Sequence, residues 1–205
     1  MTIISVTVKK GLASLEFDNP ESLLCENRPV LASLFYERGL KKGSELSPAA
    51  YCELLEQSET KRAKSRAVWL LSKKGYSKYS LRKKLNDKFI QKAVDAAIDF
   101  CEQNGFLNDS EYAASLARRL QAANKSRRQT VLYMQKEGLC KEDIENALSS
   151  ASPDESGAIA ELVARKYKDK LLQENGKQKV VAALLRRGFR YEDIKKAISL
   201  EEFYE

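Results

Sequence analysis

Two pairs of carboxylates stand at matching places in the sequence and are candidates for chemistry. Glu142 and Asp143 precede Ile144, and the same Glu-Asp-Ile triplet recurs 50 residues later at 192–194. Neighbouring carboxylates can serve as a general acid and a general base. Acidic side chains in the first turn of a helix, however, also interact favourably with the helix dipole, and the isoleucine can begin a buried face. We therefore predict that both triplets start helices and carry no catalysis.

Other kinds of chemistry are limited by residues that are missing or scattered. The chain has no histidine, which removes the commonest general base and metal ligand. Cys25, Cys52, Cys101 and Cys140 are widely spaced and form no C-x-x-C pair, so we expect reduced thiols without a zinc site or a disulfide framework. Residues 108–111 lack the spacing of a calcium site and predict a helix cap. We expect a protein that is not an enzyme and has no metal or cofactor.

The hydrophobic pattern predicts neither export nor membrane insertion. No basic segment precedes an apolar stretch at the start of the chain, and no apolar run approaches the roughly 20 residues of a membrane-spanning helix. With 43% hydrophobic residues, the chain has enough apolar side chains for a core. We expect a cytoplasmic protein without a membrane partner.

Positive charge is concentrated in one part of the chain. Residues 1–59 hold 6 basic and 9 acidic side chains, a net charge of −3, whereas residues 60–105 hold 12 and 4, a net charge of +8. Residues 106–150 and 151–205 each carry +1. Such a basic segment favours a polyanion or an acidic protein surface as partner, although a solvated helix face without a partner is the alternative.

Clusters of lysine and arginine supply the candidate binding residues. Basic side chains with neighbouring aromatic rings can hold a phosphate backbone and stack bases, or they can meet an acidic protein groove. Tyr76, Tyr79 and Tyr133 lie among these clusters, and packing between helices is the alternative role for them. The candidates, chosen on charge alone, are Lys73, Lys74, Lys78, Arg82, Lys83, Lys84, Arg118, Arg119, Arg127, Arg128, Arg165, Lys166, Arg186 and Arg187.

An internal repeat predicts the architecture that positions these residues. GLCKEDIENALS at 138–149 is matched by GFRYEDIKKAIS at 188–199, and a weaker copy lies 50 residues upstream of the first. A fixed period indicates stacked supersecondary units. Apolar residues at helical spacing predict three helices in each unit. We expect three three-helix repeats, at 59–106, 107–151 and 152–205, in an elongated array.

Capping residues predict where many of these helices begin. In the first repeat we expect a helix over about 60–74 and a second one capped by Ser77. In the second repeat we expect Asn108 or Asp109 and then Ser126 to cap helices. In the third, Ser152-Pro153-Asp154-Glu155 combines an N-cap, a proline and a glutamate, which predicts a helix start.

A small module with both strands and helices precedes the repeats. Residues 2–8 alternate with β-branched side chains and predict a strand, for which residues 12–17 are the hairpin partner. We expect a helix over residues 28–37, and another that Ser47 caps with Pro48 at its first position. This N-terminal α/β module spans residues 1–58, so the fold class is mainly α.

Several phrases in a fixed order resemble the RecX family of regulatory proteins. They are RAVWLLS at 66–72, GFLNDSEYA at 105–113 and KEGL at 136–139, followed by Ile144, Ala147 and Leu148. The resemblance covers about residues 60–205, and GLKKGSEL at 39–46 resembles the N-terminal extension of some members. The first repeat departs from the others, because Lys88-Phe89 stands where the later repeats have glycine.

The resemblance implies a modulator of the RecA recombinase. RecX-like proteins bind the RecA filament on single-stranded DNA along its groove and restrain strand exchange, ATPase and co-protease activity. We expect a monomer that contacts the single-stranded DNA weakly or through the filament. The alternatives are a helical DNA-binding protein that acts alone, such as a transcription regulator, and a protein scaffold without nucleic acid. No helix is dense in Arg, Asn and Gln as a base-reading helix would be.

Overall fold

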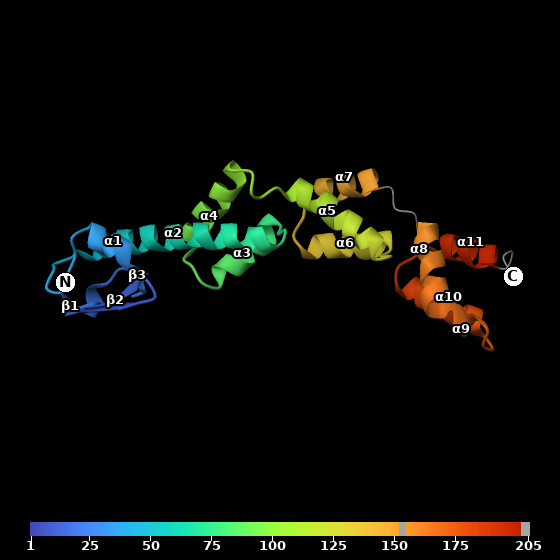
Figure 1. Cartoon of the computed structure of the whole chain (residues 1–205), viewed down its shortest axis with the longest axis horizontal. Coiled ribbons are helices and arrows are strands. Elements are labelled where there is room, and N and C mark those ends of the chain that lie inside the picture. The colour runs from blue at the N-terminus through green and yellow to red at the C-terminus, as the bar shows by residue number, and fades with distance from the viewer. Residues whose placement is uncertain (152–154, 202–205) are drawn as a thin grey trace. The chain divides into compact units, whose positions relative to one another are not determined.

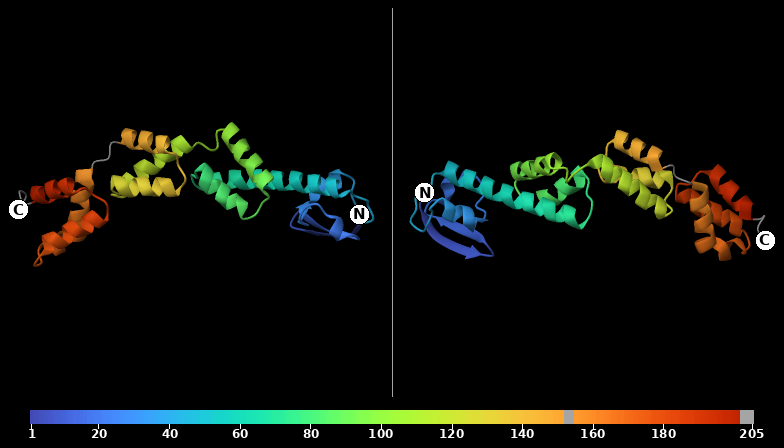
Figure 2. Two further views of the ribbon diagram at one scale, coloured as in Figure 1. Left: turned by 180° about the vertical axis from the view of Figure 1, so that it is seen from behind. Right: turned by 45° about the horizontal axis from the view of Figure 1, so that its top comes forward.

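The chain is mainly helical, with a three-stranded sheet at its N-terminus (Figure 1). The computed structural model describes residues 1–151 and 155–201, with side chains to residue 198. The chain divides into two compact units, Met1–Leu107 and Asn108–Glu205. Figure 2 shows the elements of each unit from two further directions. The fold class predicted from the sequence is confirmed.

The N-terminal sheet begins with the expected hairpin. β1 (Ile3–Lys9) pairs antiparallel with β2 (Leu12–Phe17). Lys10 and Gly11 connect them with φ values of 52° and 76°, as a two-residue hairpin turn requires. The strands are followed by a short 3-10 turn, η1 (Pro20–Ser22).

The helix expected over 28–37 forms only in its second half. β3 (Val30–Leu31) instead adds a third strand antiparallel to β2, and α1 (Ala32–Glu37) follows it. The pairing satisfies backbone groups of β2 that would otherwise lie at the sheet edge. The prediction was wrong here because this pairing joins residues far apart in the chain, such as Ala13 and Val30.

One long helix, α2 (Pro48–Lys73), belongs to both the module and the first repeat. It starts where predicted, since the Ser47 hydroxyl accepts a hydrogen bond from the backbone N–H of Ala50 at 3.1 Å. The expectation of a separate helix beginning near residue 60 was wrong. No glycine or proline interrupts residues 49–74, so nothing stops the helix. The predicted boundary between residues 58 and 59 therefore lies inside a helix.

The two halves of α2 enter two different cores. Tyr51 and Leu54 are buried with the sheet and α1, and the ring of Tyr51 packs edge-to-face on Phe17 at 5.0 Å. Ala63 and Ala67 are buried against α3 (Lys78–Asn86) and α4 (Gln91–Gln103). Small side chains at these positions let α4 approach α2 closely, as in other tightly packed helix pairs.

The second repeat is built as its caps predicted. α5 (Asp109–Ala122) is capped by the Asn108 side chain and α6 (Arg127–Lys136) by the Ser126 hydroxyl. α7 (Lys141–Ala151) closes the bundle over a core that includes Met134. In the first repeat Ser77 caps α3 as expected.

The third repeat has an interrupted first helix. α8 (Glu155–Leu162) passes into a π-helical turn, η2 (Val163–Tyr167), and then α9 (Lys168–Leu171). α10 (Gly176–Arg186) and α11 (Tyr191–Glu201) complete the unit over a core of its own. Glu155, which the prediction places in the first turn of this helix, is helical, whereas the predicted cap at 152–154 lies outside the described residues.

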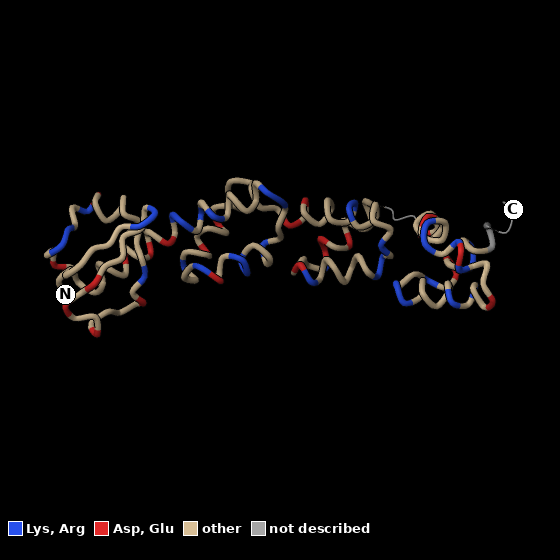
Figure 3. The backbone as a smooth tube through the Cα atoms, turned by 60° about the horizontal axis from the view of Figure 1, so that its bottom comes forward, with Lys and Arg blue, Asp and Glu red and all other residues tan. Residues whose placement is uncertain are grey.

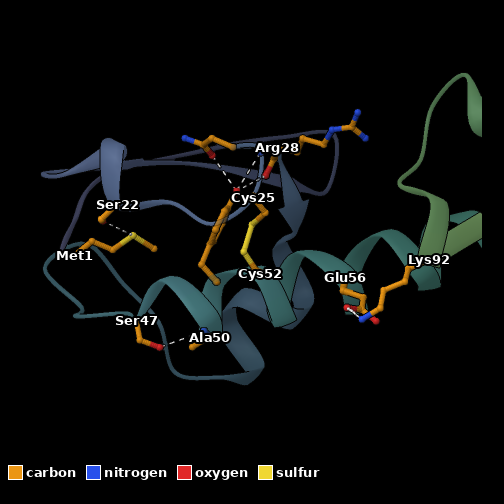
Figure 4. The surroundings of a disulfide bond; sticks show 11 residues. Met1, Ser22, Cys25, Arg28, Ser47, Ala50, Cys52, Glu56 and Lys92 are labelled. Carbon is orange, nitrogen blue, oxygen red and sulfur yellow. Dashed lines mark hydrogen bonds and ion pairs between the residues drawn. A yellow bond between two sulfur atoms is a disulfide. The ribbon is translucent and has the colours of Figure 1, made fainter.

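A disulfide joins two of the cysteines that were expected to be reduced. Cys25 bonds to Cys52 in the second turn of α2, with 6.0 Å between their Cα atoms (Figure 4). The Tyr51 hydroxyl donates to Asn27 Oδ1 at 2.9 Å, and the backbone N–H of Arg28 donates to that hydroxyl at 3.1 Å. These contacts hold the segment that carries Cys25 against α2. The sequence shows only that the cysteines are 27 positions apart, not that the fold brings them together.

We predict that reducing the disulfide destabilises the first unit. Opening the cross-link returns chain entropy to the unfolded state, so the free energy of unfolding should fall by roughly 2–4 kcal/mol. Urea unfolding followed by the emission of Trp69, the single tryptophan, reports on this unit. A variant with both Cys25→Ser and Cys52→Ser should not respond to reductant. Equal midpoints for the oxidised and reduced protein would contradict the cross-link.

We also predict that Gly188→Ala destabilises the second unit for two reasons: the positive φ of this position disfavours alanine, and the added Cβ would crowd α6. Gly188 has a φ of +84°, and a Cβ there would lie 3.0 Å from Ser126 Oγ and 3.1 Å from Arg128 Cβ. Gly105, with a φ of +69° and no atom within 4 Å of where a Cβ would stand, is the matched control. Gly105→Ala should cost about 1–2 kcal/mol and Gly188→Ala roughly 1–2 kcal/mol more, measured by urea unfolding. An equal loss of unfolding free energy in both variants would show that a Cβ at position 188 is accommodated against Ser126 and Arg128 without strain.

Candidate nucleic-acid interface

The repeated carboxylates serve as helix starts, as predicted. Glu142 and Asp143 lie in the first turn of α7, and the corresponding pair lies in the first turn of α11. Asp143 accepts hydrogen bonds from the Ser110 hydroxyl and from the Cys140 thiol, the latter at 3.0 Å. The backbone N–H of Asp143 donates to Cys140 Sγ at 3.4 Å. Asp143 thus joins the starts of α5 and α7.

Two of the predicted binding residues in the first repeat form ion pairs within that repeat. Lys78 Nζ lies 2.8 Å from Glu102 Oε1, and Arg82 pairs with Asp95. The hydrogen bond from Arg82 holds the pKa of the Asp95 carboxyl below its usual value. Both pairs connect α3 with α4, so these two cations help to hold the repeat together.

The other predicted cations of this repeat are exposed. Lys73 and Lys74 lie at the end of α2, and Lys83 and Lys84 lie on the outer side of α3. Residues 60–86 contain ten lysines and arginines and no acidic residue, and Figure 3 shows how the charges follow the chain. Because the ion pairs with α4 engage Lys78 and Arg82 and leave these four lysines exposed, a strongly positive surface remains.

The tyrosines among the basic clusters differ in their surroundings. Tyr76 is partly buried against the core of the first repeat, and the Lys74 ammonium lies 4.6 Å from its ring centroid. Tyr79 on α3 and Tyr133 on α6 are about half exposed. Packing therefore accounts for Tyr76, while the rings of the other two are accessible to a partner.

An exposed tryptophan was missed by reasoning from charge clusters. Trp69 on α2 is 49% exposed, although tryptophan is usually largely buried. The Arg66 guanidinium carbon lies 4.3 Å from its ring centroid and Lys73 Nζ lies 5.9 Å away. Positions 66, 69 and 73 share one helix face, a spacing visible in the sequence. That spacing was the signal that could have identified the residue.

In the second repeat the predicted cations stand at helix ends. Arg118 and Arg119 lie exposed in the last turns of α5, and Arg127 and Arg128 lie exposed in the first turn of α6. A shallow groove of about 510 Å³ adjoins the second pair. Its lining comes from both repeats of this unit and includes three cations, one carboxylate and several apolar residues, namely Arg127, Arg128, Val131, Leu132, Glu155, Leu185, Gly188, Phe189 and Arg190.

In the third repeat two of the predicted cations have partners within the unit. Arg165 pairs with Glu161 at 2.9 Å, and hydrogen bonds from Asn124 and then Arg165 lower the pKa of the Glu161 carboxyl. The Arg187 guanidinium lies 5.8 Å from the ring centroid of Tyr167.

The two remaining candidates of this repeat are exposed, and one of them contacts its own helix. Lys166 lies exposed in the π-helical turn. Arg186 is exposed as well, and its Nε donates to the carbonyl of Ala182 at 3.3 Å. Residues 151–205 carry a net charge of +1 and residues 60–105 carry +8, so the third repeat is less positive than the first.

Within the described residues, no group of three or more Cys, Asp or Glu side chains is arranged to hold a metal ion. No helix of the described chain is both long and apolar enough to cross a membrane.

Comparison with known sequences identifies relatives across most of the chain. Residues 154–198 match the family model described as RecX, third three-helix domain, which corresponds to α8 through α11. A "Regulatory protein RecX" from Caldanaerobacter subterraneus subsp. tengcongensis is 30% identical over 170 residues, covering 82% of this chain and 85% of the relative. One from Vibrio vulnificus is 32% identical over 143 residues, covering 67% and 92%.

Solved structures show the same fold. A structure titled "Crystal structure of regulatory protein RecX" covers 97% of this chain and 98% of its own, with a TM-score of 0.66 and 20% identity. RecX from Lactobacillus salivarius covers 71% and 97%, with a TM-score of 0.62 and 19% identity. The sequence relatives establish the relationship that the motifs suggested: the chain belongs to the RecX family of regulatory proteins.

Proposed function

We propose that this protein is a non-catalytic regulator that binds the filament of RecA on single-stranded DNA along its groove. By binding there it inhibits strand exchange, ATP hydrolysis and co-protease activity. Membership of the RecX family supports a regulatory role. We propose further that it acts as a monomer in the cytoplasm, where such filaments form.

The proposal rests mainly on one observation: residues 60–86 contain ten lysines and arginines and no acidic residue. The exposed lysines among them form a positive surface on two helices of the first repeat, α2 and α3. A nucleoprotein filament is a polyanion, and a surface of this sign increases the rate of encounter with it. Helical repeats in tandem also allow several weak contacts to act together, which raises avidity.

Inhibition of RecA tests the proposal directly. Strand exchange and ATP hydrolysis should both fall when the protein is added at amounts below one copy per RecA subunit. Unchanged rates at every ratio would refute it. Binding to random and selected DNA duplexes at two salt concentrations separates this function from sequence-specific regulation of transcription.

We predict that reversing two exposed charges on α3 weakens inhibition. Lys83→Glu with Lys84→Glu should raise the concentration needed for half-inhibition by about tenfold at low salt, because two favourable contacts become repulsive. The difference should shrink as salt screens the surface. Arg82 is left unchanged because its ion pair with Asp95 connects α3 to α4.

The matched control reverses the charge of two lysines that lie outside residues 60–86. Lys41 and Lys42 are also adjacent and exposed, but they lie within residues 1–59, which carry a net charge of −3. Lys41→Glu with Lys42→Glu should leave inhibition nearly unchanged. Equal losses from both double variants would show that net charge, rather than the surface of the first repeat, determines binding.

A further inference from the structure

A row of side chains on α2 lies beside the face that is buried in the core of the first repeat. Arg66, Trp69 and Lys73 recur at intervals of three and four residues, so they lie along one face of the helix. Ala63, Ala67 and Leu70 form the buried face of the same helix segment. Trp69 therefore contributes little to the core and keeps 49% of its surface exposed.

Cations surround the exposed ring. The Arg66 guanidinium carbon lies 4.3 Å from the Trp69 ring centroid, and Lys73 Nζ lies 5.9 Å from it. Among the residues that the structure describes, no carboxylate lies within ion-pairing distance of Arg66 or Lys73. Their charges are therefore available to an anion that reaches the ring.

The Trp69 ring and the cations of Arg66 and Lys73 are complementary to the bases and phosphates of a single nucleic-acid strand. Bases without a pairing partner stack on aromatic side chains, and the flanking phosphates bind lysine and arginine. Arg66 and Lys73 are seven residues apart, about 10 Å along the helix axis, and they bracket the ring. A base on Trp69 would therefore bring its neighbouring phosphates towards both cations. Duplex DNA keeps its bases stacked inside and offers the ring no comparable surface.

We propose that Trp69 is a stacking site for one base of single-stranded DNA, with Arg66 and Lys73 holding the adjacent phosphates. Arg66 covers one side of the indole, so the base occupies accessible ring surface that Arg66 leaves open. This inference rests on the proposed function and assigns the contact with the DNA strand to the end of α2. An acidic surface of the RecA protein is the competing occupant.

Because the chain has one tryptophan, its fluorescence reports on this position alone. Titration of the full-length protein with an oligothymidylate should quench the emission saturably, and added salt should reverse the quenching. Poly-glutamate, a polyanion without bases, should give little quenching at the same charge concentration. Equal quenching by poly-glutamate and oligothymidylate would overturn the stacking contact.

Variants test the same contact through the affinity for a labelled oligothymidylate, measured by fluorescence anisotropy. Trp69→Ala should weaken binding about 5- to 100-fold, and Trp69→Phe should retain part of the affinity. Lys73→Gln should reduce the salt dependence of log K by about 0.7, as expected for one lost phosphate contact. The control Tyr36→Ala removes a ring that is 60% exposed in the N-terminal module and should change nothing.

Inhibition of RecA by the same variants separates this inference from the proposed function. Loss of oligothymidylate binding by Trp69→Ala, with circular dichroism unchanged, supports the stacking site whether or not inhibition persists. Unchanged oligothymidylate binding with lost inhibition would overturn it and would indicate that Trp69 meets RecA itself. Unchanged binding with full inhibition would overturn it as well, while the proposed function would stand.

Discussion

The buried carboxylate of Glu59 is the interaction on which the first unit depends. Glu59 lies at the middle of α2 and is only 2% exposed. It accepts a hydrogen bond from the backbone N–H of Ile90 at 2.7 Å and lies 3.3 Å from Arg28 Nη1 and 3.8 Å from Arg62 Nη1. A buried charge costs several kcal/mol unless it is paired in this way. These partners join the N-terminal segment, α2 and the start of α4 at one point.

This constraint also determines what the first repeat exposes. Ile90 precedes α4 and its side chain cannot cap a helix, so Glu59 caps it from another helix. With its start held on α2, α4 presents Asp95 and Glu102 to the cations of α3. Those two carboxylates engage Arg82 and Lys78, and the lysines farther out remain exposed. The surface proposed to bind the filament therefore consists of the lysines that these ion pairs do not engage, such as Lys83 and Lys84.

The three repeats use similar cores but different devices to start their last helix. In the second repeat, Cys140 and Asp143 form hydrogen bonds with each other at the start of α7. In the third repeat, α11 likewise has acidic residues in its first turn. The first repeat lacks acidic residues at that place and uses Glu59 instead. A shared hydrophobic pattern therefore specifies the repeat, while the residues that vary around it set its charge and its connections.

The sequence by itself determined the features that depend on neighbouring residues. The hairpin, the caps at Ser47, Ser77, Asn108 and Ser126, and the buried helix faces follow from backbone preferences and periodicity over a few residues. The family resemblance was confirmed for the same reason, since it rested on the order of such local patterns.

Only the tertiary structure decided which distant residues meet. It paired Cys25 with Cys52, added β3 to the edge of β2, and separated the ion-paired cations from exposed ones such as Lys83. It also left Trp69 at the surface. Charge and hydrophobicity in a sequence do not say which carboxylate reaches a lysine or which ring is covered, because those contacts are set by the packing of helices far apart in the chain.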